Sequence, residues 1–62
     1  MAKFGLFDSS HKAPLQEYEG DYMQQNGEHV TIFVRTSDPS QLDEQVNAIR
    51  LDKGQSVKKI GN

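Results

Sequence analysis

Cysteine is absent from this 62-residue sequence, and so is any long apolar run. Without thiols the chain forms neither disulfides nor thiolate zinc sites, which commonly support domains this small. A chain of this length buries only about 60% of the surface that its unfolded form exposes. We therefore expect one marginally stable domain that depends on oligomerisation or on a larger partner.

No stretch approaches the roughly 20 apolar residues that a membrane-spanning helix requires. Lys3 is followed by only a few apolar residues before Asp8, so this region lacks the apolar segment of a secretory signal peptide. Together with the absence of cysteine, these features predict a cytoplasmic protein without a membrane span.

Charge is present but unevenly distributed. The net charge is −2, with most carboxylates between residues 17 and 44 and a basic C-terminal end that includes Lys58 and Lys59. Phosphate contacts supply most of the affinity for nucleic acids, so a nucleic-acid-binding module is a weaker functional alternative for an acidic chain. The asymmetry favours head-to-tail contacts or a basic docking edge. Chance clustering on a solvated surface is the plainer explanation.

Asn26 and Gly27 predict a β-hairpin over residues 15–35. Both residues readily adopt the positive φ that a two-residue type I′ turn requires. The segment HVTIFVR that follows is rich in β-branched and aromatic residues, as strands are.

The register implied by this turn divides the hairpin into two partly apolar faces. Met23 would lie opposite Val30, and Gly20 opposite Phe33. A bulge at Gly20 would instead turn the tyrosines to the opposite face, and that alternative stays open. Without the bulge, one face holds Met23, Val30, Ile32 and Val34, and the other holds Phe33, Tyr22 and Tyr18, with Arg35 against the Tyr18 ring.

Residues 38–50 carry the signals of a helix. Asp38 suits the N-cap and Pro39 suits the first helical position. Apolar residues then recur at helical spacing and form a narrow stripe, Leu42, Val46 and Ile49. Alternatively, the helix ends near residue 48 and residues 49–51 begin a third strand.

These elements predict an α+β fold in which a β-hairpin packs on one α-helix, in the order ββα or ββαβ. Residues 1–14 form an extended N-terminal arm, and residues 15–62 form the domain. In the tail, residues 54–62, a lysine-bearing edge strand or irregular structure is favoured over a last helical turn.

Candidates for catalysis and metal binding are weak. The run DSSH at residues 8–11 contains the residue types of a hydrolase triad, but sequence neighbours rarely converge as nucleophile, base and orienting group. Glu17 and Glu19 lack a desolvated pocket that would separate their pKa values. Neither His11 nor His29 has a second histidine at metal-ligand spacing. We therefore predict a protein that is not an enzyme and has no catalytic, cofactor or metal site.

Apolar residues are the better candidates for function. The arm either folds back onto the hairpin or inserts its aromatic side chains into pockets on another chain. We expect a non-catalytic accessory or structural subunit that binds a larger protein assembly. The alternative is a small self-assembling regulatory or packaging protein whose partners are identical chains. The predicted contact residues are Phe4, Leu6 and Phe7 in the arm, Tyr18, Tyr22 and Phe33 on the hairpin, and Lys58 and Lys59 in the tail.

Overall fold

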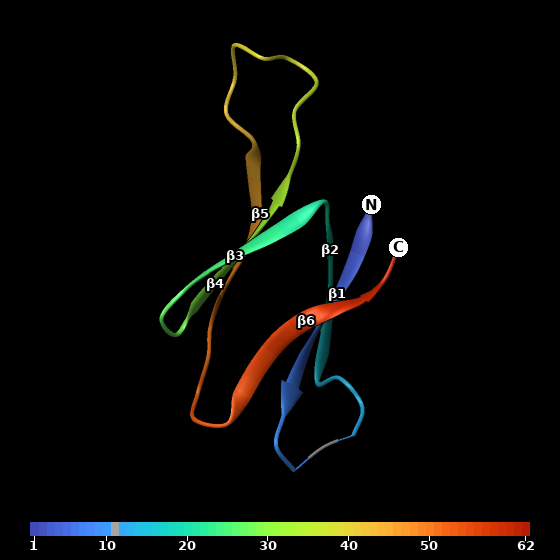
Figure 1. The fold of residues 1–62 in the computed structure, drawn as a ribbon, viewed down its shortest axis with the longest axis vertical. Coiled ribbons are helices and arrows are strands. Elements are labelled where there is room, and N and C mark those ends of the chain that lie inside the picture. Colours follow the sequence, from blue (N-terminus) through green and yellow to red (C-terminus); the bar gives the residue numbers. More distant parts are fainter. Residues whose placement is uncertain (11) are drawn as a thin grey trace.

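The computed structural model describes residues 1–10 and 12–62, which form six β-strands and no helix (Figure 1). The predicted α+β fold is therefore wrong, because the described chain is all β. None of the described residues belongs to a helix that could cross a membrane. The strands are β1 (Ala2–Asp8), β2 (Gln16–Gly20), β3 (Tyr22–Asn26), β4 (His29–Val34), β5 (Glu44–Arg50) and β6 (Gln55–Gly61).

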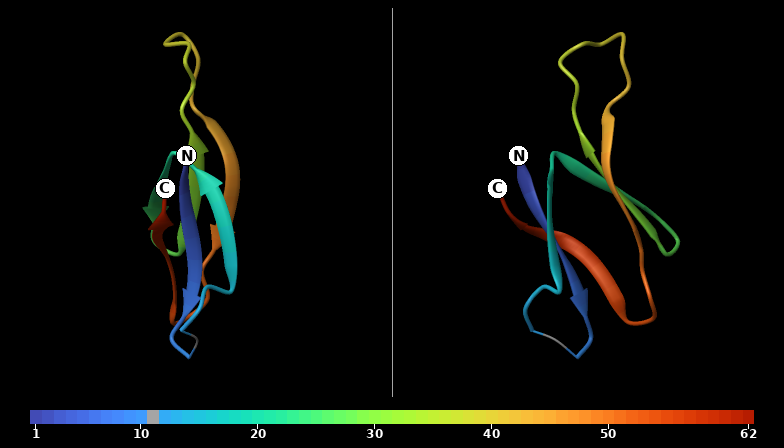
Figure 2. Two further views of the ribbon diagram at one scale, coloured as in Figure 1. Left: turned by 90° about the vertical axis from the view of Figure 1, so that its right-hand side faces the viewer. Right: turned by 180° about the vertical axis from the view of Figure 1, so that it is seen from behind.

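The strands build two three-stranded antiparallel sheets. Sheet A has the order β2-β1-β6, and sheet B has the order β3-β4-β5. The chain crosses from sheet A to sheet B between β2 and β3, and it returns between β5 and β6 (Figure 1). The two termini lie side by side in all views (Figure 2), because Lys3 of β1 pairs with Gly61 of β6.

The predicted N-terminal arm is the central strand of sheet A rather than an extension of the domain. Phe4 lies opposite Tyr18 of β2, and Leu6 lies opposite Val57 of β6. Alternate side chains of a strand point to opposite faces, so Ala2 and Phe4 turn inward. The tail forms β6 at the edge of this sheet, which is the alternative that the sequence favoured.

The core lies between the two sheets. Val30 and Ile32 of β4 are fully buried, and Phe4 of β1 is only 4% exposed. Burying each of these side chains contributes about 1.5–3 kcal/mol relative to leaving it in water. The remaining buried members are Ala2, Leu51 and Val57, with Leu6, Tyr18, Met23 and Ile49 packed against them.

A bend at Gly20 and Asp21 directs the chain from one sheet to the other. A Cβ atom on Gly20 would lie 2.4 Å from Ile32 Cγ2, so only glycine permits this close approach. The Asp21 N–H donates to the Phe33 carbonyl at 2.8 Å, outside the regular ladder of β3. At this bend the alternation between inward-facing and outward-facing side chains shifts by one residue, so the Tyr18 side chain packs on the core. Tyr22 stays with Phe33, so the predicted face that held both tyrosines is wrong.

The hairpin β3–β4 forms, but its turn lies one residue later than predicted. Gly27 has a φ of +62°, and no non-glycine residue among those described has a positive φ. Asn26 pairs with His29, so the two-residue loop is Gly27 and Glu28. Glycine at the first loop position is typical of a type II′ turn. Each pairing therefore moves by two residues along β4 (Met23 meets Ile32), and the same side chains still share a face.

No helix forms over residues 38–50. Asp38 Oδ1 accepts hydrogen bonds from the Ser40 N–H at 2.9 Å and the Ser40 hydroxyl at 2.7 Å. The Gln41 N–H donates to the Asp38 carbonyl at 3.0 Å, which closes a turn with Pro39 in its second position. The side-chain chemistry that caps a helix is here used by a turn.

The segment 44–50 forms β5 because strand pairing satisfies the second edge of β4. Ile49 lies opposite Val30 and packs against the core. The other two members of the predicted helical stripe stay outside, with Leu42 at 94% and Val46 at 39% exposure. A helix covering so little apolar surface would leave the β4 backbone donors and acceptors without strand partners, which is unfavourable.

Candidate functional site

The outer face of sheet B carries a cluster of aromatic side chains beside the loop 35–43. Tyr22 of β3 and Phe33 of β4 are register partners, and their rings stack with centroids 5.1 Å apart and planes at 15°. The Arg35 guanidinium lies over the Tyr22 ring, 5.0 Å from its centroid. We call Tyr22, Phe33 and Arg35 the aromatic cluster. Its three side chains interact by stacking and by a cation–π contact.

Asp43 connects the aromatic cluster to both ends of the loop. The Tyr22 hydroxyl donates to Asp43 Oδ2 at 2.6 Å. The Thr36 N–H donates to Asp43 Oδ1 at 3.1 Å. One carboxylate therefore ties the end of the loop to its beginning and to β3. Next to it, the Arg35 N–H donates to Asp21 Oδ2 at 2.7 Å.

These hydrogen bonds shift two pKa values. The bond from Tyr22 is the main reason that the pKa of Asp43 lies below its ordinary value of 3.8, and the bond from Thr36 adds to it. The same bond raises the pKa of Tyr22 above 10.0, because ionisation would remove the donor beside a carboxylate. Near neutral pH, Asp43 is ionised and Tyr22 is protonated. The pair is suited to holding the loop rather than to transferring a proton.

The loop 35–43 presents Leu42 to solvent. The loop extends beyond the strands at one end of the long axis (Figures 1 and 2). Its turn at Asp38 is closed by Ser40 and Gln41, and the Asp38 N–H donates to Thr36 Oγ1 at 3.2 Å. Leu42 follows this turn directly and is 94% exposed.

A second aromatic site lies on the outer face of sheet A. A Cβ atom on Gly5 would lie 2.9 Å from the Phe7 ring and 3.1 Å from Pro14, so the ring covers the glycine. Lys58 of β6 places its Nζ 4.6 Å from the centroid of the Phe7 ring. We call Phe7 and Lys58 the Phe7 site. Like the aromatic cluster, it combines a half-buried ring with a cation.

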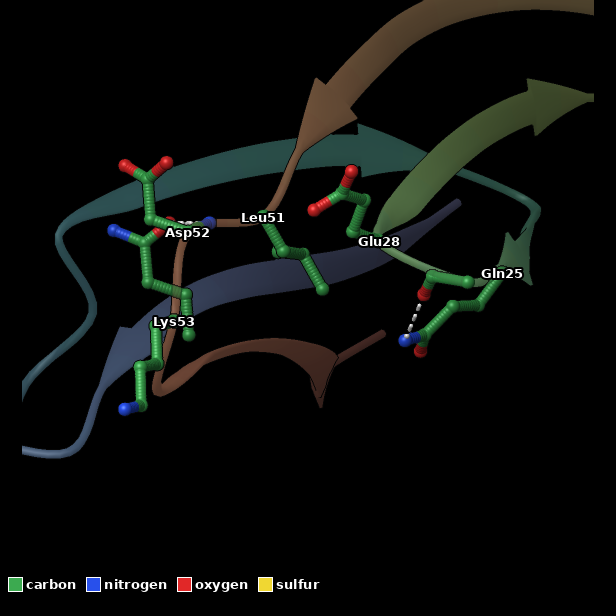
Figure 3. Close-up of a pocket in the computed structure, with 7 residues that line it drawn as sticks. Gln25, Glu28, Leu51, Asp52 and Lys53 are labelled. Carbon is green, nitrogen blue, oxygen red and sulfur yellow. Dashed lines mark hydrogen bonds between the residues drawn. The ribbon is translucent and has the colours of Figure 1, made fainter.

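A shallow open pocket of about 340 Å³ lies between the β3–β4 turn and the β5–β6 connection. Figure 3 shows Leu51 at its centre, between Glu28 and Lys53. Two polar groups are already engaged: the Gln25 side-chain amide donates to the Gly27 carbonyl, and the Asp52 N–H donates to the Gln55 side chain. Its walls carry charges of both signs and one large apolar side chain, Leu51, so they select no class of ligand. The lining residues are Gln25, Gly27, Glu28, Leu51, Asp52, Lys53 and Gln55.

The predicted contact residues fall into separate places. The structure joins Tyr22 with Phe33 and Phe7 with Lys58, but it does not bring these two pairs together. The arm therefore meets the hairpin at Tyr18, which lies opposite Phe4 and packs on the core, and Arg35 lies over Tyr22 instead of Tyr18. Of the others, Phe4 is in the core, Leu6 and Tyr18 pack against it, and Lys59 is exposed opposite Phe4 on β6.

Sequence reasoning missed Asp43 and Leu42 as site residues. Asp43 lies 21 residues from Tyr22, so no local pattern indicates that the two side chains meet. Leu42 was assigned to a buried helical stripe. In the sequence, Leu42 stands between the polar residues Gln41 and Asp43. These polar neighbours are the available signal that the Leu42 side chain is exposed.

The side chains considered above as catalytic or metal-binding candidates do not come together in the fold. Among residues 1–10 and 12–62, no group of three or more histidine or carboxylate side chains is arranged to hold a metal. Asp8 accepts hydrogen bonds from the Ser10 N–H and hydroxyl, as in a turn. His11 lies outside the described residues, and Glu17 and Glu19 are exposed.

Comparison of the chain with protein-family models, with curated proteins and with solved structures gave no match.

Proposed function

We propose that the protein is a non-catalytic accessory or structural subunit that binds a larger protein assembly. The main support is that both sheets carry partly exposed aromatic rings with cations on their outer faces. Aromatic residues and arginine are enriched at protein interfaces, because they combine a large apolar contact area with polar groups.

Because the core is small, binding to a partner would also affect the stability of the folded chain. Among residues 1–10 and 12–62, the buried cluster contains six side chains, so the isolated chain has little stability in reserve. A partner that binds the folded form stabilises it by mass action. Contact over the outer faces would therefore add to the stability of the subunit as well as to the assembly.

The charges near the aromatic cluster favour a protein over a nucleic acid as the partner. Asp21 and Asp43 both accept hydrogen bonds at the edge of this cluster. Their carboxylates would repel phosphate groups, which supply most of the affinity for nucleic acids.

The test is the native mass of the protein, tagged at its own locus and extracted gently from its own cells. We expect a complex far larger than the 7.0 kDa chain, containing a second kind of protein. A free monomer would contradict the proposal. A complex made only of identical chains would favour self-assembly, for which the open edges of both three-stranded sheets offer a route.

The same measurement on two variants examines the Phe7 site. Phe7→Ser removes a partly exposed ring beside Lys58, and we expect the bound fraction to fall several-fold. Val46→Thr is the control, because it removes apolar surface from a 39%-exposed side chain on β5 in the other sheet. Circular dichroism of both variants checks that they remain folded.

A further inference from the structure

Leu42 stands apart from the other exposed apolar residues. It is 94% exposed, whereas Met1 is 71% exposed and Leu15, Val46 and Ile60 lie near 40%. A single exposed leucine is common on protein surfaces and does not by itself indicate a binding site. What distinguishes Leu42 is the ordered loop that carries it.

Hydrogen bonds hold the backbone on both sides of Leu42. Before it, the Gln41 N–H donates to the Asp38 carbonyl. After it, the Asp43 carboxylate accepts from the Thr36 N–H and from the Tyr22 hydroxyl. A side chain displayed on an already ordered loop loses less conformational entropy on binding than one on a flexible loop.

Leu42 is also continuous with the aromatic cluster. Asp43 follows Leu42 in the chain and bonds to Tyr22, whose ring contacts Phe33 and Arg35. A partner that covers Leu42 would therefore lie next to the aromatic surface, and the two together would form one contact area.

The charge of the loop indicates which charges would line the rim of a complementary pocket. Residues 35–44 contain three carboxylates, Asp38, Asp43 and Glu44, and one cation, Arg35, which lies over the Tyr22 ring. Hydrogen bonds from Ser40 keep the pKa of Asp38 below its ordinary value, so this carboxylate stays ionised near neutral pH. A pocket that receives Leu42 would be apolar at its base and positively charged at its rim.

The pocket beside Leu51 on a second copy of this chain would not suit the loop. The pocket beside Leu51 has acidic groups, Glu28 and Asp52, next to its one lysine. Leu51 is the one large apolar residue in its lining, and it is only 6% exposed. Carboxylates there would face the carboxylates of the incoming loop.

We propose that Leu42 inserts into an apolar pocket, rimmed by lysine or arginine, on a different protein. This inference rests on the proposed function and identifies the loop 35–43 as its contact point. Leu42 serves as the apolar anchor, and the surrounding carboxylates pair with the basic rim of the pocket.

The experiment compares Leu42→Asn with Leu15→Asn, both in the tagged protein at its own locus. Leu15 is an exposed leucine in the connection between β1 and β2, so it controls for the loss of a surface leucine. We expect Leu42→Asn to lower the fraction of protein in the complex at least tenfold and Leu15→Asn to change it less than twofold. Equal thermal unfolding of the two purified variants excludes misfolding as the cause.

A photo-crosslinking amino acid at position 42 identifies the pocket. We expect crosslinks to one foreign protein, at apolar residues flanked by lysine or arginine. Glu44→Lys, which reverses the charge that begins β5 directly after the loop, should also weaken the complex and reduce its sensitivity to salt.

Two results would overturn the inference while the proposed function stands: a complex that persists unchanged with Leu42→Asn, or crosslinks from position 42 only to identical chains within a larger complex. Absence of any complex with the unmodified protein would contradict both proposals.

Discussion

Ile32 and Leu42 are aliphatic side chains of equal size, ten residues apart in the sequence, in opposite environments. Ile32 is fully buried between the sheets, whereas Leu42 is 94% exposed at the end of a loop. Fully burying a leucine contributes about 1.5–3 kcal/mol, which is a large amount for a core of six side chains. The chain forgoes this contribution at Leu42, so stability of the isolated fold does not explain the residue.

The difference arises from the backbone around each residue. Ile32 lies at the centre of β4, paired with Met23 on one side and with Asn47 on the other, and it meets Gly20 at the bend between the sheets. Leu42 follows a turn closed by polar side chains and belongs to no strand. Ile32 therefore contributes to the core, whereas Leu42 contributes little to it, as the proposed role of Leu42 in binding requires.

The largest expected effect tests the core side of this comparison. Ile32→Ala should lower the free energy of unfolding by about 2–5 kcal/mol, because it removes buried apolar surface and leaves a cavity. Total stability for a chain of this length is roughly 3–9 kcal/mol, so the loss removes a large part of it and, at the lower end of this range, unfolds the variant. Urea unfolding followed by circular dichroism measures the change.

A milder substitution at the same position provides a measurable control. Ile32→Val should cost about 0.5–1.5 kcal/mol, which leaves enough folded protein for a complete unfolding curve. Wild-type stability in both variants would show that the two sheets do not depend on Ile32.

An intermediate effect is expected at the base of the loop that displays Leu42. Tyr22→Phe keeps the ring stacked on Phe33 and removes the hydroxyl that donates to Asp43. We expect the melting temperature at pH 7 to fall by a few degrees, less than in Ile32→Ala. Amide hydrogen exchange should quicken at Thr36, because its N–H bonds to the Asp43 carboxylate that Tyr22 holds in place. Unchanged exchange there would mean that Tyr22 does not order the loop.

The stability lost in Tyr22→Phe should depend on pH in a defined direction. The pKa of Asp43 is lowered in the folded protein, so its contribution is present above 3.8 and is lost as the pH falls through the folded value. The pKa of Tyr22 is raised, so its contribution is present below 10.0 and is lost as the pH rises through the folded value. The difference between wild type and Tyr22→Phe should therefore be largest between these limits. A difference that grows outside them would contradict this assignment.

The smallest effect on stability is expected at Leu42 itself. Leu42→Asn should change the free energy of unfolding by no more than about 0.5 kcal/mol, because the side chain is almost entirely in water. Unfolding of the purified variant beside the wild type measures the change. A loss above about 1 kcal/mol would assign Leu42 a role in folding and remove its contrast with Ile32.

Parts of the fold followed from local patterns. Glycine at position 27 and the β-branched run after it predicted the hairpin, although the turn begins one residue later than expected. Alternation placed Tyr22 and Phe33 together outside and Val30 and Ile32 together inside. The lysine-bearing tail was favoured as an edge strand, and β6 is one.

Other parts were not predictable from local patterns. Asp38 and Pro39 begin a turn as readily as a helix, because an aspartate side chain accepts the same backbone N–H bonds in both. The segment 44–50 became a strand because β4 had an unpaired edge. The bond between Tyr22 and Asp43 depended on that outcome, so this part of the candidate site could not be derived in advance.

Local sequence was thus sufficient for the alternation along β4, for the charge of the loop and for a hairpin near Gly27, but not for the position of its turn. The assembled fold was needed to place β1 at the centre of sheet A, to make β5 a strand and to leave Leu42 in solvent. The physical reason is that turns and alternation depend on neighbouring residues, whereas strand pairing joins backbone groups far apart in the chain. Its free energy depends on which edges the rest of the molecule leaves open.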